Sequence, residues 1–368
     1  MDELYIGLMS GTSIDGIDAC LVNLTDNQFK LLATDYQPYP KTVKRQLAEI
    51  ISSQQLAMHN LAVLDHELAI LNGEAVNSLL KSTKHKASDV LAIGYHGQTV
   101  FHEPDGNHPN SIQLGDANVL VDRTGITTVA DFRRMDMAAG GQGAPLAPAF
   151  HEYLFRDKTE DRAILNTGGI ANLTLLSADQ SKPVIGFDTG PASCLMDEWC
   201  MLHRDQPYDK NGDWARQGKL NTRILAKLLT DPYFAKPPPK STGREYFHLD
   251  WIKQLVDIDS VSSNDMLTTL TCLTATTITD ALKQYAPATR KVFVCGGGVH
   301  NSFLLEQLKE SLGDIELDST TRLGLDPDWV EACAFAWLAR QRLLDLPGNL
   351  PSVTGANKVV ILGAIYRN

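Results

Sequence analysis

Two stretches of the chain repeat one pattern, and this repeat restricts the possible folds more than any other feature. In each stretch an apolar strand leads into a turn of small residues and a second strand returns, over Gly7–Thr12 and Ile164–Gly169. The residues behind each turn favour strands joined by short turns, an antiparallel arrangement. Because strands and helices alternate after each opening, the sequence predicts an α/β chain of two related domains.

The chain length agrees with two domains. It has 368 residues, and a domain usually holds about 100–200 residues. We expect a first domain over residues 1–130 and a second over residues 131–368, whose last residues pack back on the first. The apolar pattern also predicts strands over Val90–Tyr95 and Lys291–Cys295 and a helix over Pro191–His203.

Charge and targeting signals narrow the class of protein. The net charge is −11, from 44 acidic and 33 basic residues, which argues against nucleic acid as the main ligand. Nucleotides stay possible, because backbone N–H groups and a metal ion can hold a few phosphates. We expect no signal peptide and no membrane span. The six cysteines form no CxxC pair, which fits reduced thiols in the cytoplasm.

The first small-residue turn is a candidate phosphate site. It is neither a Walker loop nor a GxGxxG turn that opens a helix, because a second strand follows it. Small residues let the backbone approach an anion, and the N–H groups and hydroxyls can point at phosphate oxygens. A plain hairpin turn favours the same residue types. The nucleotide-binding candidates here are Gly11, Thr12, Ser13, Ile14, Asp15, Gly16, Ile17 and Asp18.

Two of these residues are also candidate metal ligands. Asp15 and Asp18 are three residues apart, and their carboxylates suit Mg²⁺, either directly or through water.

Two further glycine turns strengthen the phosphate hypothesis. Thr167, Gly168 and Gly169 form the equivalent turn of the second repeat, and two such turns facing each other across a cleft can clamp one polyphosphate. Gly296, Gly297 and Gly298 lie between a strand and a helix, where a nucleoside can rest on bare backbone. The alternative for each is a tight turn with no ligand.

Two carboxylates stand out by their positions. Asp188 ends a buried strand directly before a helix, so it either caps that helix or serves as a general base. Glu331 lies on an otherwise apolar helix, as an edge residue or as an inward-facing charge.

Several polar side chains follow another buried strand. This mixture of residue types can bind sugar hydroxyls and a carboxylate, although each one alone is more often a satisfied turn residue. The candidates for substrate binding are His96, Gln98, Asp116 and Arg133.

A long polar segment separates two helices of the second half. Residues 231–248 are rich in Pro, Gly and Lys, and Pro237–Gly243 is predicted to be an extended, exposed loop. Such a loop is either a lid over a site or decoration.

Taken in order, these motifs resemble those of the 1,6-anhydro-N-acetylmuramic acid kinase family, within the actin, sugar kinase and heat-shock ATPase superfamily. The resemblance covers nearly the whole chain. It implies two actin-like (ribonuclease H-like) domains with an ATP cleft between them, the first with sugar-binding insertions. One departure is Ser193, where we expect Asn. The matching segments are Gly7–Asp18, Gly94–Pro104, Gln113–Asp116, Asp131–Pro148, Asn166–Asn172, Phe187–Ala192, Gly296–Asn301 and Glu331–Ala339.

The resemblance implies an unusual double reaction in peptidoglycan recycling. Water adds to the anomeric carbon of 1,6-anhydro-N-acetylmuramic acid while O6 takes the γ-phosphoryl group of ATP, with Mg²⁺ as the metal. It implies that Asp188 activates the water and that Glu331 lies close to the substrate. It adds Asn301 to the nucleotide site, and it suggests a homodimer.

The lactyl carboxylate of this sugar needs a partner of its own. We expect Arg133 to fill this role, because its planar guanidinium can hold a carboxylate with two parallel bonds. Arg134 is the neighbouring alternative, or Arg133 pairs with Asp131 and Asp136 and only braces the loop.

Two other functions remain open at this point. One is an ordinary hexokinase-like enzyme that acts on a free amino sugar. The other is a nucleotide-dependent sensor or assembly protein on the same fold, which would bind ATP without sugar-stimulated turnover.

Overall fold

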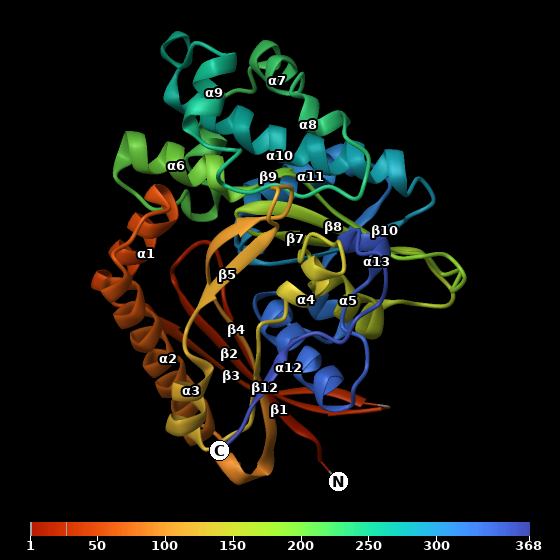
Figure 1. Ribbon diagram of the computed structural model, residues 1–368. Helices are drawn as coiled ribbons and strands as arrows, with labels where there is room; N and C mark the ends of the chain where they lie inside the picture. Colours follow the sequence, from red (N-terminus) through yellow and green to blue (C-terminus); the bar gives the residue numbers. More distant parts are fainter. Residues whose placement is uncertain (1, 27) are drawn as a thin grey trace. The chain divides into compact units, whose positions relative to one another are not determined.

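The computed structural model describes residues 2–26 and 28–368. By their contacts these residues form two compact units: the described residues up to 150 together with 329–368, and residues 151–328. Within the described part of the chain, no helix is both long and apolar enough to cross a membrane. Both units combine sheet and helix, so the predicted α/β class is confirmed (Figure 1).

The first unit is built on a seven-stranded sheet. Six of its strands follow the order β12-β6-β4-β1-β2-β3, and the seventh, β5, pairs with β4. The pairs β1–β4 and β4–β6 are parallel, whereas β1–β2 and β2–β3 are antiparallel. The strands are β1 (Leu4–Ser10), β2 (Gly16–Thr25), β3 (Gln28–Pro38), β4 (Val90–Glu103), β5 (Asn110–Leu114), β6 (Thr128–Ala130) and β12 (Ala364–Tyr366).

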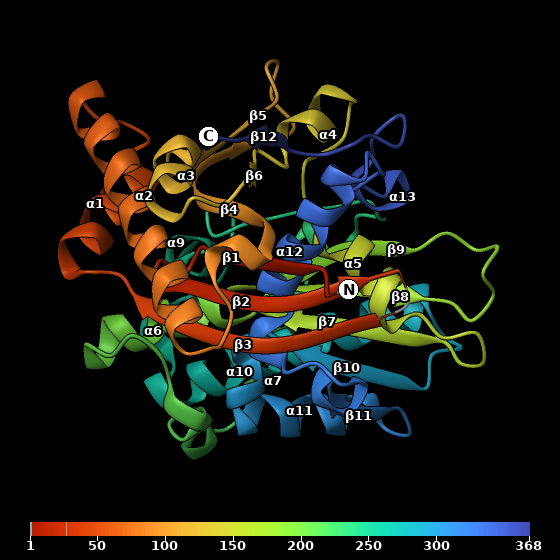
Figure 2. The ribbon, with the colours of Figure 1, turned by 90° about the horizontal axis from the view of Figure 1, so that it is seen from below.

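Helices cover both faces of this sheet because side chains alternate along β1. Ile6 and Leu8 belong to one core cluster with residues of α1 and α2. Gly7 faces α12, where a Cβ would lie 1.8 Å from the Ala332 carbonyl oxygen. Figure 2 shows α2 beside β2 and β3. The helices of this unit are α1 (Lys41–Ser53), α2 (Met58–Lys81), α3 (Ala117–Thr124), α4 (Arg134–Ala138), α12 (Val330–Leu343) and α13 (Pro351–Thr354). Helix α5 (Ala147–Phe155) contains the division between the units after residue 150.

The second unit holds a five-stranded sheet with the order β11-β10-β7-β8-β9. Its inner residues pack on α10 and α11 in one cluster, and a second, aromatic-rich cluster joins α6, α7, α9 and α10. The strands are β7 (Arg162–Thr167), β8 (Ile170–Leu176), β9 (Ile185–Pro191), β10 (Lys291–Cys295) and β11 (Glu316–Ser319). The helices are α6 (Ser193–Arg204), α7 (Thr222–Leu228), α8 (Pro232–Ala235), α9 (Leu249–Leu255), α10 (Ser263–Tyr285) and α11 (Ser302–Leu312).

The predicted repeat is confirmed: β1–β2–β3 and β7–β8–β9 are both antiparallel meanders that open on a small-residue turn. The contacts divide the chain after residues 150 and 328, whereas the sequence suggested a division after residue 130. Residues 329–368 group with the first unit. The predicted cleft between two domains stays a prediction.

The segment 231–248 is less exposed than its composition predicted. It contains the short helix α8, and Lys240 is only 7% exposed. The expectation of an exposed loop holds at Pro237 and Pro239 and is wrong at Lys240, because its ammonium group donates to the backbone carbonyls of Tyr233 and Phe234.

Candidate active site

The turn between β1 and β2 presents polar groups to solvent. Thr12, Ser13 and Asp15 are exposed, and the Gly11 carbonyl accepts hydrogen bonds from the Ile14 N–H at 3.3 Å and from the Gln98 side chain at 3.1 Å. Gln98 therefore fixes this turn from the neighbouring strand β4. Its predicted contact with substrate stays a prediction.

The donor set of this turn fits a magnesium ion that also binds phosphate. Asp15 Oδ1 accepts from the Ser13 hydroxyl at 2.7 Å and from the Gly16 N–H at 3.1 Å. Asp15 and Asp18 both help to raise the pKa of Tyr36 to about 12, after burial, so both charges lie near that ring. Mg²⁺ in nucleotide sites commonly takes one or two carboxylates together with phosphate oxygens. A cage of three or more His, Cys, Asp or Glu is absent from residues 2–26 and 28–368, so phosphate would have to complete the site.

The buried His96 contacts the partly buried Arg133 in the first unit. Arg133 Nε and Nη2 lie 3.2 and 2.8 Å from His96 Nε2, and Nη1 donates to the Gly143 carbonyl at 2.8 Å. Burial and the Arg133 charge hold the pKa of His96 well below its usual value. His96 is thus neutral and accepts from Arg133 through Nε2, so Nδ1 carries the ring proton.

Arg133 stays cationic, although burial lowers its pKa to about 10 while Glu331 and Asp136 act in the opposite direction. It makes no direct ion pair with Asp131, which pairs with Arg134 at 3.2 Å instead. Asp136 accepts from the Gly143 N–H at 2.8 Å and from Asn349 and Thr354 at 2.7 Å each. Asp136 is therefore a structural acceptor of the turn at residues 140–143. Glu331, on α12, is the negative charge that acts most strongly on Arg133.

Asp116 has a structural role at the start of α3. Its side chain accepts from the Asn118 N–H at 2.8 Å, so it is the N-cap of that helix. Substrate binding by Asp116 stays a prediction.

The glycine turns of the second unit fit closely against each other. The Thr167 hydroxyl donates to the Cys295 carbonyl at 3.1 Å. A Cβ on Gly296 would lie 2.2 Å from Asn166 Oδ1, and one on Gly298 would lie 2.4 Å from the Thr167 hydroxyl. A Cβ on Gly297 would meet nothing within 4 Å. Gly296 and Gly298 thus leave no room for a side chain, while a side chain at Gly297 would face open space. Nucleotide binding by the three glycines stays a prediction. Asn301 caps α11 by accepting from the Leu304 N–H at 3.0 Å.

The turn at Gly168 and Gly169 is anchored to the start of α6. The Gly168 carbonyl accepts from the Ser193 N–H at 3.1 Å, and the Gly169 carbonyl accepts from the N–H groups of Ala192 and Cys194 at 3.0 and 3.1 Å. In a trans peptide the C=O and the following N–H point in opposite directions. The N–H groups of Gly169 and Ile170 therefore point away from α6, as a phosphate-binding turn requires.

Asp188 lies in the middle of β9, so the expectation that it ends this strand is wrong, because the strand continues to Pro191. The loop that follows α8 holds Asp188. Its Oδ2 accepts from the Thr242 N–H at 2.9 Å, and its own N–H donates to the Lys240 carbonyl at 3.1 Å. Burial raises the pKa of Asp188 to about 7, against the Thr242 hydrogen bond, which lowers it. Helix α6 receives no side-chain cap, so the capping alternative for Asp188 is wrong.

Sequence reasoning missed the residues that surround this carboxylate. Lys240 and Thr242 contact Asp188, and Arg244 lies against Gly169. Residues 240–244 are Lys, Ser, Thr, Gly and Arg. Such small polar and cationic residues are also common in exposed loops, so the sequence held no clear signal for these contacts. At the departure noted above, the Ser193 hydroxyl donates to Asp197 at 2.8 Å.

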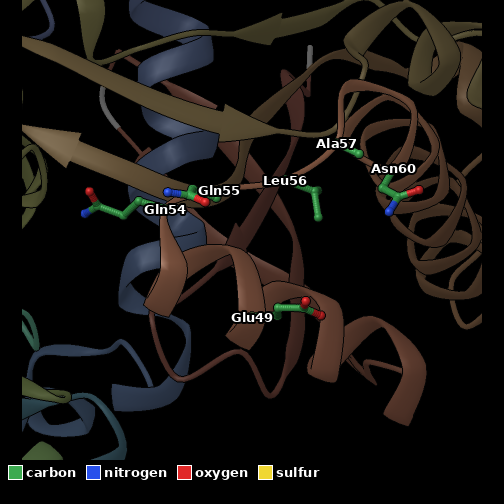
Figure 3. Close-up of a pocket in the computed structure, with 6 residues that line it drawn as sticks. All are labelled: Glu49, Gln54, Gln55, Leu56, Ala57 and Asn60. Carbon is green, nitrogen blue, oxygen red and sulfur yellow. The ribbon is translucent and has the colours of Figure 1, made fainter.

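A solvent-facing hollow of about 600 Å³ lies elsewhere in the first unit. Figure 3 shows its lining at the connection between α1 and α2, with Glu49 and Asn60 on the two helices and Gln55 between them. None of the predicted site residues lines this hollow, so it contributes nothing to the candidate active site.

Comparison with known proteins gives a consistent result over the whole chain. A family model described as anhydro-N-acetylmuramic acid kinase matches residues 3–368. The kinase of that name from Coxiella burnetii (strain RSA 493 / Nine Mile phase I) is 48% identical over 364 residues, covering 99% of this chain and 97% of that protein. The one from Vibrio cholerae serotype O1 is 47% identical over 365 residues, covering 99% and 98%. Among solved structures, a ROK family glucokinase from Streptomyces griseus in complex with glucose and AMPPNP is 14% identical with a TM-score of 0.40, covering 92% of this chain and 99% of that chain.

Proposed function

The chain belongs to the anhydro-N-acetylmuramic acid kinase family, and from that premise we propose that it phosphorylates 1,6-anhydro-N-acetylmuramic acid at O6 and opens the anhydro ring with water in one reaction. Kinase activity and a place in cell-wall sugar recycling follow from the family. The products we propose are N-acetylmuramic acid 6-phosphate and ADP. A cytoplasmic homodimer completes the proposal, and the six cysteines are buried free thiols, as a reducing compartment favours.

The environment of Asp188 is the observation that carries this proposal. A carboxylate that takes a proton from water works best with a pKa near the working pH. Burial raises the pKa of Asp188 to about 7, and the Thr242 N–H fixes one of its oxygens. These two features support the assignment of Asp188 as the group that activates the water molecule.

The bond changes balance without a separate acid. Asp188 removes a proton from water, and the water oxygen bonds to the anomeric carbon. The bond from that carbon to O6 breaks with its electron pair on O6, which bonds to the γ-phosphorus as the bond to the β-phosphate oxygen of ADP breaks. The leaving oxygen needs no proton because it captures the phosphoryl group, unlike the leaving group of an ordinary inverting glycosidase.

Phosphoryl transfer depends mainly on position and charge neutralisation. We assign the turns at residues 11–18 and 167–169 to the phosphates and the Gly297 backbone to the nucleoside. Asp15 and Asp18 would hold Mg²⁺, which neutralises charge on the phosphate oxygens when bound. His96, Arg133 and Glu331 are assigned to the sugar.

Isotope labelling tests the proposal directly. The protein is incubated with ATP and anhydro sugar in ¹⁸O-labelled water, and the product is analysed by mass spectrometry. We expect one label at the anomeric oxygen and none on the phosphate. A hexokinase-like enzyme would phosphorylate the open sugar and form no product from the anhydro sugar, whose O6 is an ether oxygen without a proton. A nucleotide sensor would show no sugar-stimulated turnover.

A further inference from the structure

Arg244 lies beside the glycine turn at residues 168 and 169, and the proposed function gives this arginine no role. Its Nε and Nη2 atoms are both 3.1 Å from the point that a Cβ on Gly169 would occupy. This guanidinium therefore rests on the bare backbone of the turn, in the space that any other residue at position 169 would fill.

The Arg244 guanidinium has fewer acceptors among the described residues than it has donors. Arg244 Nε is buried and has no hydrogen-bond acceptor among the described residues. Its nearest carboxylate, Asp197, is 3.9 Å away, and the Arg244 side chain is 33% exposed. Burying a donor of a charged group without an acceptor is costly, so the arrangement favours an external anion.

Asp197 is a poor anion for this arginine. Its Oδ2 already accepts from the Ser193 hydroxyl at 2.8 Å. Burial raises the pKa of Asp197 to about 6, in spite of the Ser193 hydrogen bond and Arg244, which both lower it. The carboxylate thus orients Arg244 at a distance but does not saturate its donors.

We propose that Arg244 binds an oxyanion of the reactants, and the adjacent turn identifies the γ-phosphoryl group of ATP as that anion. This inference rests on the proposed function. Arg244 brings the planar donor pair Nε and Nη2 to Gly169 of this turn, and such a pair can hold two oxygens of one oxyanion. Arginines that contact a transferring phosphoryl group neutralise the charge that is shared among its oxygens. The lactyl carboxylate of the sugar is the other oxyanion present, and the experiment separates the two.

The test compares Arg244→Gln and Arg244→Lys with Arg223→Gln, an exposed arginine on α7 of the same unit. We expect Arg244→Gln to lower kcat on the order of 10²-fold, the usual loss when one transition-state donor is removed. Calorimetry should show weaker ATP binding and unchanged ADP binding. Arg244→Lys should retain part of the activity because the charge remains, and Arg223→Gln should match the wild type.

Each outcome has a defined meaning. A loss confined to sugars that carry the lactyl group supports an oxyanion site with the carboxylate as its ligand. The proposal is overturned if Arg244→Gln weakens the binding of ATP, of ADP and of anhydro sugars with and without the lactyl group equally, or changes none of these affinities. Arg244 would then only brace Asp197. If Arg244→Gln does not fold, the ATP-to-ADP affinity ratio of Arg244→Lys decides. The labelling experiment uses only wild-type protein, so failure of the proposed function is recognised separately.

Discussion

The Thr242 N–H donates to Asp188 Oδ2 at 2.9 Å, so the loop after α8 positions the carboxylate in the middle of β9. The same loop accepts the Asp188 N–H through the Lys240 carbonyl, and the Tyr233 hydroxyl donates to the Asp188 carbonyl at 2.8 Å. Three contacts from one segment thus hold both the backbone and the side chain of the proposed base. The polar loop is a support for the site rather than decoration.

Removing the base tests its role most simply. Asp188→Asn keeps the shape of the side chain but removes its ability to accept a proton at neutral pH. We expect turnover to fall on the order of 10² to 10⁴-fold, the range for a positioned general base, while calorimetry shows ATP binding largely retained. Activity within a few-fold of the wild type would exclude Asp188 as the base.

The pH dependence follows from the raised pKa of this carboxylate. Asp188 must be ionised to activate water, and burial raises its pKa to about 7. The rate should therefore fall as the pH drops through about 7, by about tenfold per pH unit below it.

A loop variant shows whether Asp188 causes this pH profile. The Thr242 N–H stabilises the charged form, so Thr242→Pro, which removes that donor, should move the midpoint up by roughly one to two pH units. Thr242→Ala keeps the N–H and serves as the control. If both variants keep the wild-type midpoint, another group controls the profile.

The two glycine turns of the repeat should respond to bulk in the same way. A Cβ on Gly11 would meet nothing closer than 3.6 Å, and one on Gly169 would meet the Arg244 side chain at 3.1 Å. Gly11→Val and Gly169→Val should therefore fold and bind ATP more weakly. Unchanged nucleotide affinity in both, measured by calorimetry, would show that the turns do not hold phosphate. A melting curve close to that of the wild type is the control.

Sequence patterns predicted the framework of the site but not its supports. The strand–turn–strand repeat is local in sequence, so its alternation and glycines were enough to place β1–β2 and β7–β8. The contact between Thr242 and Asp188 joins residues that are 54 positions apart, and no periodicity encodes such a contact. The approach of α12 to Gly7 is similarly long-range, with the Ala332 carbonyl where a Cβ would lie. Individual polar side chains can also have more than one role: Asp116 and Asp136 both accept structural hydrogen bonds, and substrate binding by Asp116 stays a prediction.

The last prediction concerns the partner of the lactyl carboxylate. Arg133 donates to His96 and to the Gly143 carbonyl, which uses three of the five N–H groups of a guanidinium. The remaining donors suffice for one carboxylate. Arg133→Lys keeps the charge and removes the planar fork, so binding of the lactyl sugar should weaken by about 1.5–3 kcal/mol, as for a charged hydrogen bond. An anhydro sugar without the lactyl group should bind as tightly as before.

A matched control is adjacent in the chain. Arg134 is exposed and pairs with Asp131 at 3.2 Å, so Arg134→Lys should leave the affinity for both sugars unchanged. A selective loss in Arg134→Lys would transfer the role to that residue. Equal losses on both sugars in Arg133→Lys would assign Arg133 to structure, because its contact with His96 does not depend on which sugar is bound. Calorimetry with the two sugars separates these results, because only a residue that binds the lactyl carboxylate directly affects the two affinities differently.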